Sequence, residues 1–210
     1  MMRRGRIQRQ FVHGIVKKGY EMRAKYLWLC LGVAAAVPAA AQSGLQNENL
    51  LVPMPAGFKV GSADTNDGTR MTEYILTGET VDDWSRMITE VTLLGRGGLD
   101  PDGLPTDMAE GWKSACEGAR VERVANAQDN GYPSSVWVFA CPNNPQTGKP
   151  ETMYMKVIAG NDSLYSLQYA FRQTLSREMT ASAMDYLKKA LVCDTRQPEH
   201  PCPKGMKSLP

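Results

Sequence analysis

The chain has 210 residues and a formal net charge of +2, but eight of its 24 lysines and arginines lie in the first 41 residues. Residues 42–210 carry 16 basic and 21 acidic side chains, so their formal net charge is −5. An acidic surface repels phosphate backbones and anionic lipid, which excludes nucleic-acid binding as the main function.

The first recognisable element is an export signal at residues 22–41. A basic start at Arg23 and Lys25 precedes an apolar run from Leu27, and the run ends in the small residues that lead to Ala41. This run is about 15 residues long, shorter than the ~20 needed to span a bilayer. We therefore expect cleavage after Ala41, with an uncleaved membrane anchor as the alternative.

Residues 1–21 precede this signal, and we interpret them as an extension of the gene model, with translation starting at Met22. A long basic leader is the alternative interpretation of their arginines and lysines. In either case the mature protein is expected in the periplasm or outside the cell, with no membrane anchor after cleavage.

Four cysteines follow the leader, and an even number in an exported chain indicates disulfide bonds. Cys193 and Cys202 lie nine residues apart across a proline-rich stretch and can close a local loop. That leaves Cys116 to pair with Cys141, although four cysteines permit three pairings. Bonds of these spacings stabilise a domain by about 2–3 kcal/mol each.

The first half of the mature chain is expected to form strands and two helices. Thr80 with an acid at Asp83 has the form of a capping box, which predicts a short helix through Met87. A second helix is predicted from Thr106, because apolar residues recur at helical spacing up to Cys116. Residues 42–52 read as a loose lead-in, and strands are predicted at 57–61, 71–77 and 88–92.

The second half is expected to be mostly strand, followed by a last helix. The tripeptide Gly160-Asn161-Asp162 separates two alternating runs and predicts a hairpin of residues 152–159 and 163–171. Strands are also predicted at 121–125 and 135–141, the latter central because it is apolar on both faces, and a helix at 180–193.

These elements predict one α+β domain at residues 42–193: a mostly antiparallel sheet packed by two to three helices and stapled by disulfides. Residues 194–210 are proline-rich and are expected to form an irregular tail pinned by Cys202.

The candidate chemistry is sparse. His200 is the single histidine after residue 41, and no catalytic or phosphate-binding motif occurs, so the sequence predicts no catalytic residues. Two alternatives stay open. Carboxylates such as Glu79, Asp82 and Asp83 could serve a hydrolase that acts on envelope material.

The other alternative is metal handling by the tail, where Cys193, His200 and Cys202 lie within ten residues of each other. Export favours the disulfide over thiolate ligands, so we predict neither a metal nor another cofactor. Trp84 is a possible interaction residue, because polar side chains flank it; contact with the core is the alternative.

Several segments together resemble a set of small exported bacterial proteins that lack an assigned function. They are residues 78–89, 160–165, 192–194 and 200–203. The order of strands and helices is also loosely similar to the PsbP/Mog1-like α/β/α sandwich. That resemblance implies binding or assembly roles more often than catalysis, and it implies no catalytic residues here.

We therefore expect an exported, non-enzymatic domain that binds an envelope protein or a small ligand.

Overall fold

The structure, a computed structural model, describes residues 45–203. The export signal, the cleavage site at Ala41 and the extension at residues 1–21 lie outside the described residues, as does the end of the tail. Seven strands form one antiparallel sheet in the order β2-β3-β4-β8-β7-β6-β5, and two more form a small sheet, β1-β9. The strands are β1 (Glu48–Leu51), β2 (Phe58–Asn66), β3 (Thr69–Leu76), β4 (Arg86–Leu94), β5 (Arg120–Asp129), β6 (Tyr132–Asn144), β7 (Lys149–Ala159), β8 (Ser163–Phe171) and β9 (Leu191–Asp194).

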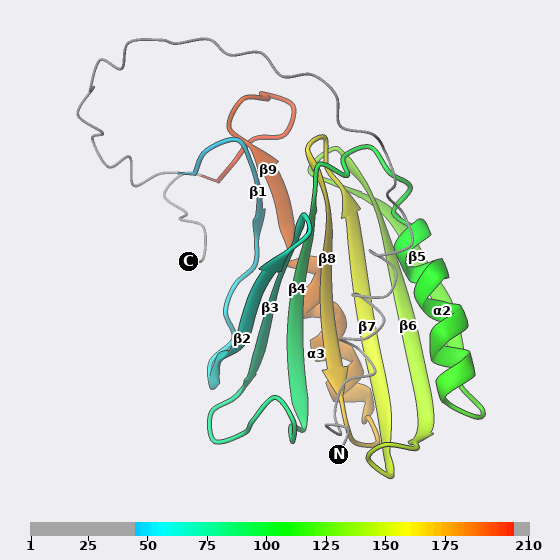
Figure 1. The fold of residues 1–210 in the computed structure, drawn as a ribbon. Coiled ribbons are helices and arrows are strands. Elements are labelled where there is room, and N and C mark those ends of the chain that lie inside the picture. The colour runs from blue at the N-terminus through cyan, green and yellow to red at the C-terminus, as the bar shows by residue number, and fades with distance from the viewer. Residues whose placement is uncertain (1–44, 204–210) are drawn as a thin grey trace, which may run out of the picture.

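Two helices, α2 (Gly103–Ala115) and α3 (Arg177–Lys188), lie on opposite faces of the large sheet (Figure 1). The predicted class, a mostly antiparallel sheet packed by helices, is confirmed with two helices in the described part of the chain. The layering also agrees with the α/β/α sandwich that the resemblance implied. No helix among residues 45–203 is long and apolar enough to cross a membrane.

The α3 face of the sheet is aromatic and is covered over its centre. Tyr169 stacks on Phe171 with ring centroids 4.4 Å apart and meets Tyr186 of α3 edge-on at 5.4 Å. Beyond α3, the sheet β1-β9 covers Ile158 and Tyr165. Alternation along the strands puts these residues on one side of the sheet, where their burial drives the packing.

The α2 face has a different core, made of methionines, tryptophan and a disulfide. Met108 and Trp112 of α2 pack on Phe139 of β6 and on the methionines of β7. The Cys116–Cys141 disulfide ties the end of α2 to β6. Helix α2 contacts β5 and β6, so it lies over one part of this face.

The predicted helix from Thr80 through Met87 is wrong. Asp83 does donate its backbone N–H to the Thr80 hydroxyl at 3.1 Å, but the segment is a turn. Glu79 accepts the backbone N–H of Ser85. Strand β4 then begins at Arg86 and contains the β-branched residues that follow. Pairing of β4 with both β3 and β8 outweighs one local capping bond.

Several boundaries also differ from the prediction: β2, β5 and β6 are longer than expected, and α2 begins at Gly103. The lead-in contains β1, which pairs with β9, and the last helix begins at Arg177 after the cap residue Ser176. That helix ends at Lys188, because residues 191–194 form β9 instead. The central, fully buried strand is β8, whereas the strand predicted as central is part of β6, one position from the edge.

Candidate functional site

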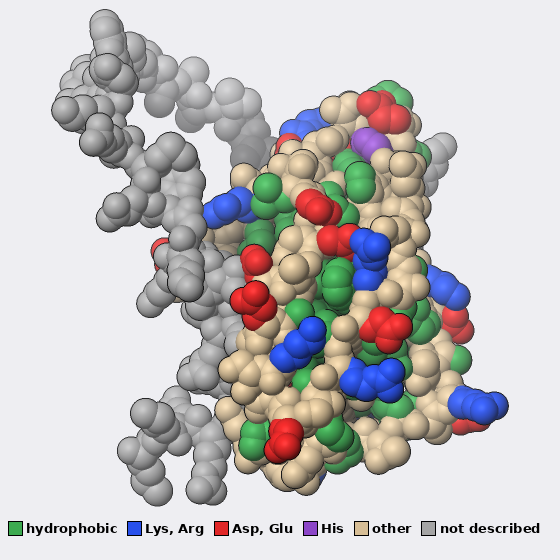
Figure 2. Space-filling view, turned by 90° about the vertical axis from the view of Figure 1, so that its right-hand side faces the viewer, with side chains coloured by type: hydrophobic (Ala, Val, Ile, Leu, Met, Phe, Trp, Pro, Cys, Tyr) green, Lys and Arg blue, Asp and Glu red, His purple; other side chains and the backbone are tan. Residues whose placement is uncertain are grey.

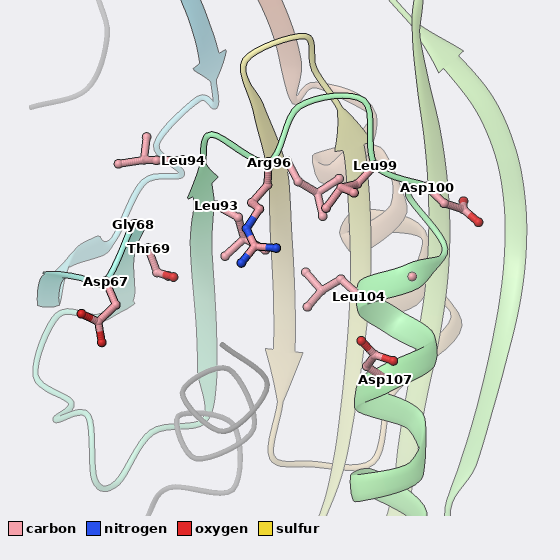
Figure 3. A pocket seen from close by; sticks show the side chains of 12 residues that line it. Asp67, Gly68, Thr69, Leu93, Leu94, Arg96, Leu99, Asp100, Leu104 and Asp107 are labelled. Atoms are coloured by element: carbon pink, nitrogen blue, oxygen red, sulfur yellow. The ribbon is translucent and has the colours of Figure 1, made fainter. Parts of the chain in front are cut away.

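A groove of about 290 Å³ opens beside the start of α2. It is built by segments that are far apart in sequence: the turn between β2 and β3, the end of β4 with its following loop, α2, and the start of β8 (Figure 3). We refer to it as the groove. Its lining consists of Asp67, Gly68, Thr69, Leu93, Leu94, Arg96, Leu99, Asp100, Gly103, Leu104, Asp107 and Leu164.

The groove has a buried apolar floor and an exposed apolar edge. Leu104 and Leu164 are 8% and 2% exposed and belong to the core beneath α2. Leu99, by contrast, is 45% exposed at the edge, whereas Leu94 points away from Leu93 and out of the groove (Figure 3). Apolar side chains that continue from a core out to the surface are typical of a contact site.

Two contacts position the loop that carries Leu99. The Gly98 N–H donates to the Gly160 carbonyl at 2.8 Å, which ties the loop to the β7–β8 hairpin. Gly97 lies so close to the Asn161 carbonyl that a Cβ atom at this position would collide with it. Glycine is therefore required for this approach, and the position of the groove depends on the hairpin.

The charged groups of the groove lie mostly at its edges. Asp67 and Asp107 are exposed on opposite walls, and neither carboxylate bonds to a residue of the described chain. The Asp100 side chain accepts the backbone N–H of Asp102 at 2.9 Å. Arg96 extends across the middle of the groove between the leucines (Figure 3).

Two N–H groups in the first turn of α2 donate to the chain itself. Gly103 donates its N–H to Asp100 at 3.0 Å, Thr106 donates to Asp102 at 3.1 Å, and Pro105 has no N–H. The Asp102 side chain accepts from Trp137 at 3.0 Å and pairs with Arg123. Burial opposes ionisation of Asp102, yet these hydrogen bonds hold its pKa below the usual range.

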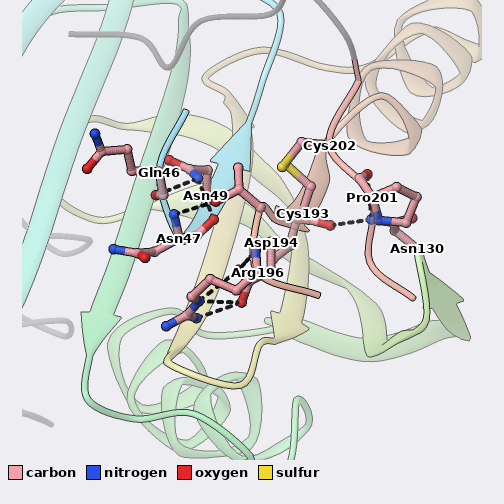
Figure 4. The surroundings of a disulfide bond; sticks show 11 residues. Gln46, Asn47, Asn49, Asn130, Cys193, Asp194, Arg196, Pro201 and Cys202 are labelled. Carbon is pink, nitrogen blue, oxygen red and sulfur yellow. Dashed lines mark hydrogen bonds and ion pairs between the residues drawn. A yellow bond between two sulfur atoms is a disulfide. The ribbon is translucent and has the colours of Figure 1, made fainter. Parts of the chain in front are cut away.

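A second polar assembly, which we call the clamp, consists of β1, β9 and residues 195–203 (Figure 4). The Cys193–Cys202 disulfide closes its loop. The Glu48 carboxylate accepts three backbone N–H groups of the β7–β8 hairpin, from Asn161, Asp162 and Ser163, at 2.6–3.1 Å. The β1 strand of the clamp is therefore bound to the hairpin that supports the groove.

An arginine links the tail to the same hairpin. Arg196 forms ion pairs with Asp194 and Asp162, each at 2.6 Å. Its hydrogen bonds to Asp194, acting against burial, hold the Asp194 pKa below the usual range. The carboxylate of Asp194 is fully buried, so the paired guanidinium supplies the charge compensation that it requires.

The tail residues proposed as metal ligands have other partners. Cys193 and Cys202 are bonded to each other, so neither is a thiolate. The His200 ring stacks on Tyr132 with centroids 3.9 Å apart, and its Nδ1 lies 2.7 Å from the Asn130 carbonyl oxygen. No group of three or more potential ligand side chains is arranged for a metal ion within residues 45–203.

Trp84, the possible interaction residue, is 3% exposed and packs in the core beside α2. The Arg172 guanidinium lies 3.8 Å from its ring centroid and pairs with the buried Glu151 at 3.3 Å. A surface role for Trp84 is therefore wrong. The polar residues that flank it in sequence lie in a turn, which lets the indole point inward.

The carboxylates of the hydrolase alternative do not line the groove. Glu79 accepts hydrogen bonds from the backbone and hydroxyl of Ser85 at 3.0 and 2.6 Å. The Asp83 side chain is 88% exposed and lies 3.8 Å from Lys149. These residues stabilise a turn, and hydrolysis stays a prediction without a described substrate site.

The sequence does not reveal the groove. It shows no motif in residues 95–105, although Leu99 is apolar among glycines, aspartates and prolines. It also indicates no role for Asp67 or Asp107, whose side chains line one groove only in the folded chain.

On the side of the molecule with β5 and α2, acidic and basic side chains are interspersed without a patch of one sign (Figure 2).

No family model matches the chain, and no curated protein matches it. Two solved structures are similar at low level. LpqN of Mycobacterium tuberculosis, described as involved in cell envelope biogenesis, is 11% identical with a TM-score of 0.38, over 72% of this chain and 87% of LpqN. The Ran-binding protein Mog1p of Saccharomyces cerevisiae is 12% identical with a TM-score of 0.38, over 68% of this chain and 85% of Mog1p. We base no conclusion about function on these similarities.

Proposed function

We propose that the protein is an exported, disulfide-stabilised binding domain that holds a partner in the cell envelope through the groove. Two disulfides within one domain are compatible with an oxidising compartment outside the cytosol. The export signal in the sequence supports the same location. Binding, rather than catalysis, is the function that the geometry supports best.

One observation carries this proposal: the exposed Leu99 at the edge of the groove. Leu99 is 45% exposed beside a buried apolar floor, and the loop that presents it is fixed to the β7–β8 hairpin. An exposed leucine held in a fixed position beside an apolar groove is best explained by a partner that covers it.

Site-specific photo-crosslinking in the native bacterium tests the proposal. A photoreactive phenylalanine analogue replaces Leu99 in the full-length protein, and the envelope fraction is irradiated. The matched control places the analogue at Val124 on β5, which is also 45% exposed but lies outside the groove. We expect a discrete adduct from position 99 and none from position 124.

Equal crosslinking at both positions, or none at position 99, would contradict the groove as the binding site. Export is checked separately by N-terminal sequencing of the protein from the envelope fraction, which should begin at Gln42. Recovery of an uncleaved protein from the cytosol would contradict the exported location.

A further inference from the structure

The size of the groove indicates what kind of ligand it accepts. Its volume of about 290 Å³ lies at the lower limit of small-molecule sites, which run from about 300 to 1,000 Å³. A space of this size holds one or two apolar side chains rather than a whole cofactor. The exposed Leu99 extends the contact area along its edge. This combination is typical of a pocket for an anchoring side chain of a polypeptide.

The charge of the walls indicates which residues flank that anchor. Asp67 extends from the β2–β3 turn on one wall, and Asp107 extends from α2 on the other (Figure 3). Both are exposed and form no ion pair with any residue of the described chain. Two carboxylates on opposite sides of an apolar floor complement two cations on either side of an apolar side chain.

The positive groups of the groove do not make an anion site. The N–H groups of Gly103 and Thr106 at the start of α2 donate to the chain itself, and Pro105 has no N–H. Arg96 is the single basic residue in the lining, and it lies in the middle, away from both aspartates. The flanking cations of a ligand therefore fit at the walls and not at the centre.

We propose that the groove binds an extended peptide segment of an envelope protein in which one apolar residue is flanked on both sides by lysine or arginine. This inference rests on the proposed function, because it assigns the chemistry of the partner to the same site. The apolar side chain lies on Leu93, Leu104 and Leu164, and the flanking cations pair with Asp67 and Asp107.

The test uses labelled peptides and the mature protein, with binding followed by fluorescence anisotropy. The probe repeats the pattern lysine–leucine–lysine twice, separated by glycine. One comparison peptide carries glutamate in place of lysine, and another carries serine in place of leucine. We expect the probe to bind, and each comparison peptide to bind at least tenfold more weakly.

Variants of the protein then assign the contacts. The double variant Asp67→Asn/Asp107→Asn should weaken binding about three- to tenfold and reduce its dependence on salt, as expected for exposed ion pairs. Leu99→Ser should weaken binding by a similar factor. The matched control, Glu122→Gln/Glu199→Gln, removes the same charge from exposed sites outside the groove and should leave binding unchanged.

The outcomes separate this inference from the function on which it rests. If the glutamate peptide binds as well as the probe, or the control variant weakens binding as much as the aspartate variant, the inference is overturned, although crosslinking at position 99 can still support a binding groove. If the serine peptide binds equally well, unspecific charge pairing explains the binding and the inference also fails. If no peptide binds while position 99 still crosslinks, the groove holds a partner of different chemistry; loss of that crosslink would remove the proposed function itself.

Discussion

The two faces of the large sheet are built in different ways. The α3 face is covered over its centre: α3 and the sheet β1-β9 pack on it, and the buried Lys156 is paired with Asp129, although Val60 at the β2 edge is exposed. On the α2 face, the helix covers part of the sheet, and the groove with the exposed Leu99 opens beside the helix. Stability and binding are therefore expected to separate onto opposite faces, since a site that must accept a partner leaves apolar surface uncovered.

Both faces nevertheless meet at the β7–β8 hairpin. Glu48 and Arg196 hold the hairpin from the clamp, and Gly98 is bonded to it from the groove. A substitution in the clamp should therefore loosen the loop that forms the groove, whereas a substitution at the edge of the groove should leave the clamp unchanged. Three substitutions test this comparison.

The largest loss of stability is expected from Lys156→Met on the α3 face. The Lys156 side chain is 4% exposed and donates to Asp129 at 2.7 Å and to the carbonyls of Leu187 and Ala190 at the end of α3. Removing it leaves a carboxylate and the helix terminus without their cation, which should lower the free energy of unfolding by about 3–4 kcal/mol. Urea denaturation measures the change.

The control for this change is Lys149→Met, whose side chain is 53% exposed on the same strand. Its effect should stay within about 0.5 kcal/mol. Equal losses for the two variants would show that Lys156 does not anchor α3.

A smaller loss is expected from Glu48→Gln in the clamp. The carboxylate accepts three backbone N–H groups, and a neutral amide accepts them more weakly, so unfolding should become easier by about 2 kcal/mol. Hydrogen exchange should also accelerate at the Gly98 amide, because its acceptor Gly160 lies in the hairpin that Glu48 holds. Glu199→Gln, an exposed change in the same tail, is the control. An unchanged exchange rate at Gly98 would show that the clamp does not support the groove.

The smallest effect concerns pH and comes from Glu90 on the α3 face. Burial raises the Glu90 pKa from 4.5 to about 7, although a hydrogen bond from Tyr74 at 3.2 Å partly opposes the shift. Because the folded state holds this proton more tightly than the unfolded state, the contribution of Glu90 to stability is present below pH 4.5. It is lost as the pH rises through 7.

The free energy of unfolding of the native chain should therefore fall between pH 5 and pH 8 by about 1–2 kcal/mol more than that of the Glu90→Gln variant. Thermal unfolding at the two pH values measures the difference, with Glu122→Gln as the exposed control. A native chain whose stability does not fall between pH 5 and pH 8, relative to the Glu90→Gln variant, would contradict the assignment.

The sequence determined those features whose signal is local. Alternating residues predicted most strands, and Gly160-Asn161-Asp162 predicted the hairpin between β7 and β8. The short spacing of Cys193 and Cys202 favoured the pairing that the structure has. Period-two burial, turn residues and loop length each depend on neighbours along the chain, so they can be predicted from the sequence alone.

Tertiary structure alone decided the rest. Residues 80–87 carry a helix-capping pattern, yet 80–85 form a turn and 86–87 begin β4, because β4 gains two strand partners. Residues 191–194 continue an apolar helical pattern, yet they form β9 because β1 lies beside them. The groove likewise unites Asp67, Leu99, Asp107 and Leu164, which share no spacing in sequence. Pairing and burial between distant segments outweigh local preferences of a few tenths of a kcal/mol to about 1 kcal/mol per residue, and these long-range contacts exist only in the folded chain.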